Sequence, residues 1–180
     1  MPARGFWKQT YPVIILTIVV AICVVLLAFT DSITRDKIKA QEEEGIKTML
    51  AQLFPEMSRY DFKDDIYMIY SDGERVGFAF IATGRGYGGN ITILVGLEDE
   101  TTVKGITIVS QTETPGLGTR ITEPSFSEQF SGIAINDIAL SRDGGEIDAV
   151  SGATISSSAV VDAVRATALE KVRQLKESGG

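Results

Sequence analysis

The feature that most constrains this chain is an uncharged, strongly apolar run near its N-terminus. Residues 11–29 read YPVIILTIVVAICVVLLAF. A helix of about 20 residues crosses the hydrocarbon core of a bilayer, so this run is long enough for one membrane span. A cleaved signal peptide would have a shorter apolar stretch and a small-x-small exit, which Ala28-Phe29-Thr30 matches weakly. We therefore predict an uncleaved N-terminal anchor.

The composition of the rest of the chain excludes several classes of function. The chain has 180 residues, a net charge of -7 and no cluster of basic residues, so nucleic-acid binding is not expected. It has no histidine, which removes the Ser-His-Asp triad and the commonest metal ligand. Its single cysteine, Cys23, lies in the apolar run, so no metal or iron–sulfur site is predicted. Redox chemistry would therefore need an organic cofactor.

The chain is predicted to consist of an anchor over residues 1–30, a helical neck over residues 31–55 and a globular domain over residues 56–180. Pro55 is expected to end the neck helix. Apolar residues recur in the neck every three or four positions, which is typical of a helix with one buried face: Ile46, Met49, Leu50 and Leu53.

The domain is predicted to be α+β, with an antiparallel sheet and packed helices. Asp72-Gly73 is a hairpin signal between two β-prone segments. Four such segments form a predicted meander: residues 66–70, 76–82, 91–97 and 103–110. A short helix is expected over residues 122–132 and a final helix over residues 154–176. The face that this final helix should pack on the sheet is Val160, Val164, Ala168 and Val172, with Leu169 and Leu175 beside it.

A glycine-rich loop precedes the third of these strands. Residues 84–89 read GRGYGG, a formal match to G-x-G-x-x-G, but a strand follows instead of the helix that a dinucleotide fingerprint requires. The loop is either a simple turn or a ligand loop. In the second case its glycines, Gly88 among them, would let backbone amides approach a ligand, and Tyr87 would stack on a flat ring.

A second glycine- and proline-containing segment follows the predicted strand that ends near Ser110. It reads ETPGLG, and its composition dictates the backbone shape. It is either a strand-to-helix connection or a rigid loop whose amides line a cofactor site. The candidate binding residues in it are Glu113, Thr114, Pro115, Gly116, Leu117 and Gly118.

The third segment, residues 148–154, reads DAVSGAT and joins a predicted short strand around Ile147 to the final helix. Unpaired amides and the helix dipole make such a junction a ready phosphate site. Thr154 places a hydroxyl where a phosphate would rest. Taken alone, the segment is better explained by Ser151 or Thr154 capping the helix.

Taken together, these motifs resemble the FMN-binding domain of the G subunit of Rnf-type electron transport complexes, and also the C subunit of the sodium-pumping NADH:quinone reductase. The resemblance implies that the phosphate of FMN is esterified to Thr154 by a separate transferase that uses FAD and magnesium. Gly152 and Ala153 would keep the approach open, with Ser151 as a phosphate or cap partner. Asp148 would serve the transferase, through its metal or the threonine proton, or would simply fix the turn through its backbone.

The resemblance also implies a function and a location. The chain would be an electron-transfer subunit, not catalytic alone, of a complex that couples ferredoxin and NAD redox chemistry to sodium or proton transport. Its partners would be other membrane and peripheral subunits and, during maturation, the flavin transferase. The domain would lie on the extracytoplasmic side of the cytoplasmic (inner) membrane. The alternatives are the C subunit of the quinone reductase, which the length of 180 residues disfavours, and a non-redox membrane-anchored module that binds a peptide.

Overall fold

The computed structural model describes residues 4–178, so the outermost ends of the predicted anchor and domain, residues 1–3 and 179–180, lie outside the described residues. The chain divides into two compact units at Gly45 and Ile46. One continuous helix, α1 (Arg4–Leu53), supplies all of the described part of the first unit and the start of the second. The division into an anchor, a neck and a domain at residues 30 and 55 stays a prediction.

The first unit is helical and apolar. Within the described residues, Ile14–Asp31 is the window long and apolar enough to cross a membrane, with a mean hydropathy of 2.8. Its large side chains are exposed, Leu27 to 70% for example. An apolar helix whose side chains are uncovered suits a lipid environment, because such exposure to water is unfavourable. As predicted, the helix ends just before Pro55.

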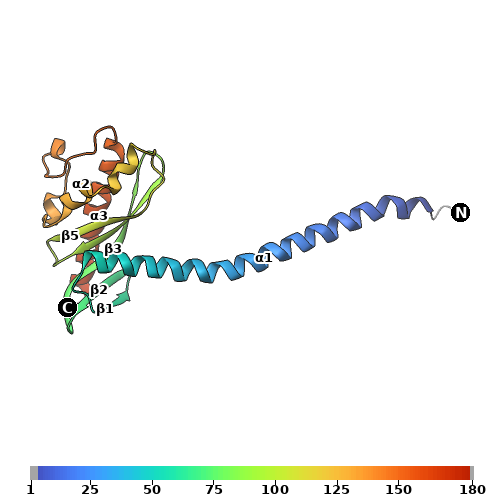
Figure 1. Ribbon diagram of the computed structural model, residues 1–180, viewed down its shortest axis with the longest axis horizontal. Coiled ribbons are helices and arrows are strands. Elements are labelled where there is room, and N and C mark those ends of the chain that lie inside the picture. Colours follow the sequence, from blue (N-terminus) through green and yellow to red (C-terminus); the bar gives the residue numbers. More distant parts are fainter. Residues whose placement is uncertain (1–3, 179–180) are drawn as a thin grey trace. The chain divides into compact units, whose positions relative to one another are not determined.

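The second unit is built on a five-stranded antiparallel sheet with the strands in sequence order (Figure 1). The strands are β1 (Arg59–Lys63), β2 (Ile66–Ser71), β3 (Glu74–Arg85), β4 (Asn90–Leu97) and β5 (Val103–Ser110). The predicted meander and the α+β class are confirmed. Asp72 and Gly73 both have positive φ, 50° and 89°, as the tight turn between β2 and β3 requires.

Two features of the sheet were not expected from the sequence. Strand β1 pairs with β2 from Arg59↔Tyr70 to Lys63↔Ile66 and forms the edge of the sheet. It is mostly exposed, so it lacks the apolar alternation that marks a half-buried strand. Strand β3 also continues past the predicted end at residue 82 to Arg85, because it stays paired with β4 as far as Arg85↔Asn90.

Several short helices follow the sheet and cover part of it. They are η1 (Gly118–Thr122), α2 (Pro124–Ser127), η2 (Glu128–Phe130), η3 (Ile135–Asp137) and η4 (Ser141–Asp143). The helix predicted over residues 122–132 is thus confirmed as α2 and η2. The short strand predicted around Ile147 is wrong: Ile147 forms one isolated parallel bridge with Leu140, because no further pairing extends it.

The last helix, α3 (Thr154–Ser178), lies against the sheet (Figure 1). The four residues of its predicted packing face are all buried. Leu175 packs against the same core, whereas Leu169 remains 45% exposed, contrary to its expected place beside that face. The sheet buries its other face against the end of α1, where Leu50 and Phe54 pack on Ile69, Ala79 and Leu94. Burial on both faces fixes the central strands and the loops that leave them.

Candidate functional site

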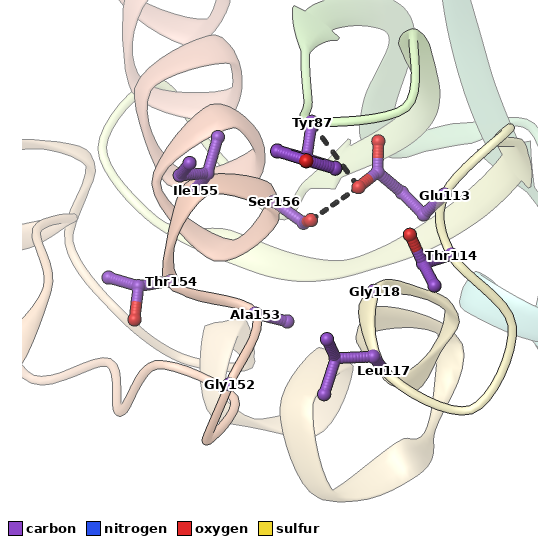
Figure 2. A pocket seen from close by; sticks show the side chains of 10 residues that line it. All are labelled: Tyr87, Glu113, Thr114, Leu117, Gly118, Gly152, Ala153, Thr154, Ile155 and Ser156. Atoms are coloured by element: carbon purple, nitrogen blue, oxygen red, sulfur yellow. Dashed lines mark hydrogen bonds between the residues drawn. The ribbon is translucent and has the colours of Figure 1, made fainter.

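A cavity of about 540 Å³ lies where three loop ends meet (Figure 2). The glycine loop between β3 and β4 supplies one wall, the segment after β5 a second, and the first turn of α3 a third. The residues that line the cavity are Tyr87, Glu113, Thr114, Leu117, Gly118, Gly152, Ala153, Thr154, Ile155 and Ser156. All three segments singled out in the sequence therefore meet at one site.

Glu113 joins the three walls through its side chain. It is buried, with 5% of its surface exposed. Its carboxylate accepts hydrogen bonds from the backbone N–H of Gly88 at 3.0 Å, from the N–H of Tyr87 at 3.3 Å and from the hydroxyl of Ser156 at 2.5 Å. Figure 2 shows the carboxylate between the glycine loop and α3. A buried carboxylate with several donors is well satisfied, so Glu113 fixes the shape of the cavity.

The glycine loop can approach Glu113 because Gly86 lacks a side chain. A Cβ at residue 86 would overlap Oε1 of Glu113, well inside the 3.0 Å that real Cβ atoms keep. Any other residue would require the loop or the side chain of Glu113 to shift, which would disturb the bonds from the amides of Tyr87 and Gly88. The ligand-loop interpretation of residues 84–89 gains support from this contact, since the loop forms a wall of the cavity.

The cavity has the size and polarity that a flat aromatic ring system needs. Apolar side chains on its walls stay open to solvent, with Tyr87 73%, Ile155 58% and Leu117 45% exposed. Small-molecule sites are usually concave, several hundred Å³ in volume and mainly apolar, with a few fixed polar groups. Here the polar groups include the side chains of Glu113, Thr114, Thr154 and Ser156. These residues fit the isoalloxazine ring of a flavin.

Thr154 is the first residue of α3 and is half-buried. Its side chain points away from Glu113, on the opposite side of the first turn (Figure 2). Within residues 4–178, no hydrogen bond engages the hydroxyl of Thr154 or that of Ser151. Ser157 ties the turn instead: its Oγ accepts from Val150 N–H and donates to the Ala153 carbonyl, both at 3.0 Å. The capping role considered for Ser151 and Thr154 is therefore not observed.

Five of the predicted contact residues do not line the cavity: Gly88, Pro115, Gly116, Asp148 and Ser151. Gly88 still acts on the site through its bond to Glu113. Asp148 accepts a hydrogen bond from Ser141 Oγ at 2.6 Å, and its backbone N–H donates to Gln129 at 2.7 Å. Asp148 thus fastens the loop before α3 to the short helices η2 and η4, instead of fixing the turn through its own backbone.

Two residues that line the cavity, Ile155 and Ser156, were not among the predicted contacts. The sequence feature that could have identified them is helical spacing. Consecutive residues at the start of a helix point in directions about 100° apart, so residues 154–156 face three different directions. Ser156 therefore reaches Glu113 while Thr154 faces the other way.

Comparison with known proteins adds independent information. The model of the FMN-binding domain family matches residues 86–169, which include the whole cavity. The chain is 34% identical over 172 residues to the G subunit of the ion-translocating oxidoreductase complex of Methanosarcina acetivorans, covering 87% of this chain and 92% of that one. It is 33% identical to the protein of the same name from Vibrio vulnificus, with 79% of each chain covered.

A solved structure shares the fold. The crystal structure of the C subunit of Na(+)-translocating NADH-quinone reductase from Parabacteroides distasonis aligns with a TM-score of 0.50 and 25% identity. The alignment covers 59% of this chain and 61% of that chain, which is less than two thirds of it.

Proposed function

This chain belongs to the family of G subunits of ion-translocating oxidoreductase complexes, and from that premise we propose that it carries FMN as an ester on Thr154 and transfers electrons within such a complex. The observation that carries the proposal is the Thr154 hydroxyl. It is not hydrogen-bonded to any of residues 4–178, it stands at the N-terminus of α3, and it borders an apolar cavity of flavin size. The match to the FMN-binding domain family supports FMN as the cofactor.

The proposed attachment is a phosphoryl transfer from FAD to Thr154, performed by a separate transferase with magnesium. Oγ1 of Thr154 forms a bond to the phosphorus of the FMN half, and the P–O bond of the pyrophosphate to the AMP half breaks. AMP leaves, and the hydroxyl proton passes to a base on the transferase. Thr154 suits this reaction because its oxygen has no hydrogen bond within the described residues that must first be broken.

The residues around the cavity would position the flavin. FMN supplies the capacity to accept and donate electrons, which no side chain here provides. Leu117, Ile155 and Tyr87 offer an apolar surface to the ring. The ester leaves the ring unmodified and keeps the cofactor local at high effective concentration, even if it moves between partners.

The apolar part of α1 and the membership in this family indicate a single-pass, membrane-anchored protein. We propose that the domain lies on the extracytoplasmic side of the cytoplasmic membrane and contacts other subunits. The coupled reaction would be electron exchange between ferredoxin and NAD, linked to sodium or proton transport. The C subunit of a sodium-translocating NADH:quinone reductase is the second candidate, which the fold similarity to the Parabacteroides protein favours.

The test uses flavin fluorescence on a denaturing gel after co-expression with a flavin transferase. The wild-type chain should give a fluorescent band, and Thr154→Val, which preserves shape and removes the oxygen, should give none. Thr154→Ser retains a hydroxyl and should keep part of the signal. Ser151→Ala should weaken it less than Thr154→Val, since Ser151 does not line the cavity. Circular dichroism must show all variants folded. A fluorescent, folded Thr154→Val chain would place the ester elsewhere, with residues 156–158 the next candidates.

A further inference from the structure

A second cavity, of about 290 Å³, lies beside Thr154. Thr154 and Ile155 line both cavities, so the first turn of α3 is a wall of each. The two cavities differ in chemistry. The larger one is lined mainly by apolar groups. The lining of the smaller one includes three charged side chains, those of Arg85, Arg142 and Asp162. Arg85 is the second residue of the glycine loop but was not among its candidate binding residues, and Arg142 lies outside the three motifs.

Arg142 is held close to Thr154 by a hydrogen bond. Its Nη2 donates to Ser158 Oγ at 3.0 Å, and its Nε pairs with Asp143 at 3.2 Å. Ser158 lies one helical turn after Thr154, about 6 Å along the axis. A guanidinium has five N–H groups, so Arg142 retains donors beyond those two bonds.

Arg85 reaches the same place from the end of β3. The neighbouring Gly84 packs so tightly on α3 that a Cβ at residue 84 would overlap the carbonyl oxygen of Ala159. This contact brings the end of β3 beside the first two turns of α3. The side chain of Arg85 is exposed and makes no hydrogen bond or ion pair with another of residues 4–178.

The charged side chains that line the two cavities make the smaller one the better site for a phosphate. The larger cavity contains the buried carboxyl group of Glu113, which would repel an anion. The smaller cavity has two guanidinium groups and one carboxylate, that of Asp162. Asp162 lies two turns after Thr154, about 12 Å along the helix axis and twice as far as Ser158. Arg142, which is bonded to Ser158, is therefore attached to α3 nearer to Thr154 than the carboxylate of Asp162 is.

We propose that Arg85 and Arg142 bind the phosphate of the FMN ester on Thr154, while the ring occupies the larger cavity. This inference rests on the proposed function. Arginine suits the role because its planar fork matches phosphate geometry and its charge-assisted hydrogen bonds are strong. The first turn of α3 would then separate the charged end of the cofactor from the buried carboxyl group. Arg85 and Arg142 would be positioning residues for the flavin.

The test compares the reactivity of individual arginines in the full chain with and without flavin. The detergent-solubilised protein is treated with phenylglyoxal, and modification is quantified for each arginine by peptide mass spectrometry. Flavinylation should lower the reactivity of Arg85 and Arg142 by roughly tenfold, as expected for a charge-assisted hydrogen bond. Arg165, which is exposed on α3 and lines neither cavity, is the internal control and should not change.

A phosphorus NMR spectrum of the flavinylated chain supplies a second readout, which separates phosphate contact from mere covering by the ring. The ester resonance should shift in Arg85→Gln and Arg142→Gln and stay in place in Arg165→Gln. If the chain carries FMN but the reactivity of Arg85 and Arg142 is unchanged and the ester resonance does not shift in their variants, this inference alone is overturned. It is also overturned if the arginine variants slow the attachment of FMN and have no other effect. A wild-type chain without the added mass of FMN would overturn the proposed function, and this inference with it.

Discussion

Among single residues, Glu113 has the largest structural role in the site, because one buried carboxylate joins the glycine loop to α3. We predict that Glu113→Gln destabilises the chain without flavin by about 1–3 kcal/mol. The amide has one acceptor oxygen where the carboxylate has two, and its NH₂ group would face an N–H or hydroxyl donor. Thermal unfolding in detergent measures the effect. Glu128→Gln, at an exposed position, is the control and should change little. Equal stability of the two variants would contradict the role given to Glu113.

The sequence predicted the residue types of the site better than their individual roles. Motifs reveal which segments carry unusual backbone demands, so Tyr87, Leu117 and Thr154 could be identified as candidates without coordinates. The residue that donates a hydrogen bond to a buried carboxylate cannot be identified from sequence motifs. Ser156 lies 43 positions from Glu113, and its bond depends on how α3 packs on the sheet. Asp148 was ambiguous for the same reason, because its partners Ser141 and Gln129 come from other helices.

At the scale of elements, the contact between β3 and α3 holds the two cavities in place. Gly84→Ala would drive a Cβ into the carbonyl oxygen of Ala159, and that atom belongs to a helix backbone that cannot rotate away. We predict a loss of stability of about 1–3 kcal/mol, as for other overpacked sites. Gly45→Ala is the control: it has open space around it inside α1 and should be neutral or slightly stabilising. Unfolding temperatures that fall equally in both variants would contradict this account.

The turn between β4 and β5 gives the molecule a pH-dependent contribution to stability. The Thr101 hydroxyl, followed by the N–H groups of Thr101 and Thr102, holds the pKa of Asp99 below its ordinary value of 3.8. A lowered pKa in the folded state stabilises the fold above pH 3.8, and this contribution is lost as the pH falls through the folded pKa.

We therefore expect wild type to be more stable than Asp99→Asn at neutral pH by no more than about 1 kcal/mol, because solvent screens this exposed group. The difference should shrink below about pH 4, where the unfolded carboxylate is protonated. Unfolding curves at several pH values measure it, with Glu98→Gln as the control for loss of one negative charge in the same turn. A difference that grows as the pH falls would show that the sign of this linkage is wrong.

Elements with strong patterns were predictable, and elements stabilised mainly by their neighbours were not. The β2–β5 meander and the packing face of α3 follow from apolar periodicity and from Asp72-Gly73. Strand β1 has no such pattern: it is an edge strand held by pairing with β2, and Phe62 stays 56% exposed beside Tyr67. The prediction of a strand at Ile147 was wrong because an apolar residue in a loop can be buried without extended pairing to a neighbouring strand.

At the scale of the whole molecule, the proposed function requires the domain to face away from the cytoplasm. Protease added to intact spheroplasts should digest residues 46–180 and leave the apolar part of α1 in the membrane. The physical reason is that an uncleaved single span exposes its C-terminal portion on one side only. Detection with an antibody against the C-terminus follows the digestion, and a cytoplasmic marker protein controls for leakage. Protection of the domain until the cells are lysed would contradict the proposed orientation.

The intact-protein mass of the chain purified from cells that contain the flavin transferase tests the central claim most directly. We predict a gain equal to one FMN less one water, located by peptide fragmentation on Thr154, and no gain in Thr154→Val. A wild-type mass equal to that of the unmodified sequence, in a preparation that shows a folded domain by circular dichroism, would contradict it.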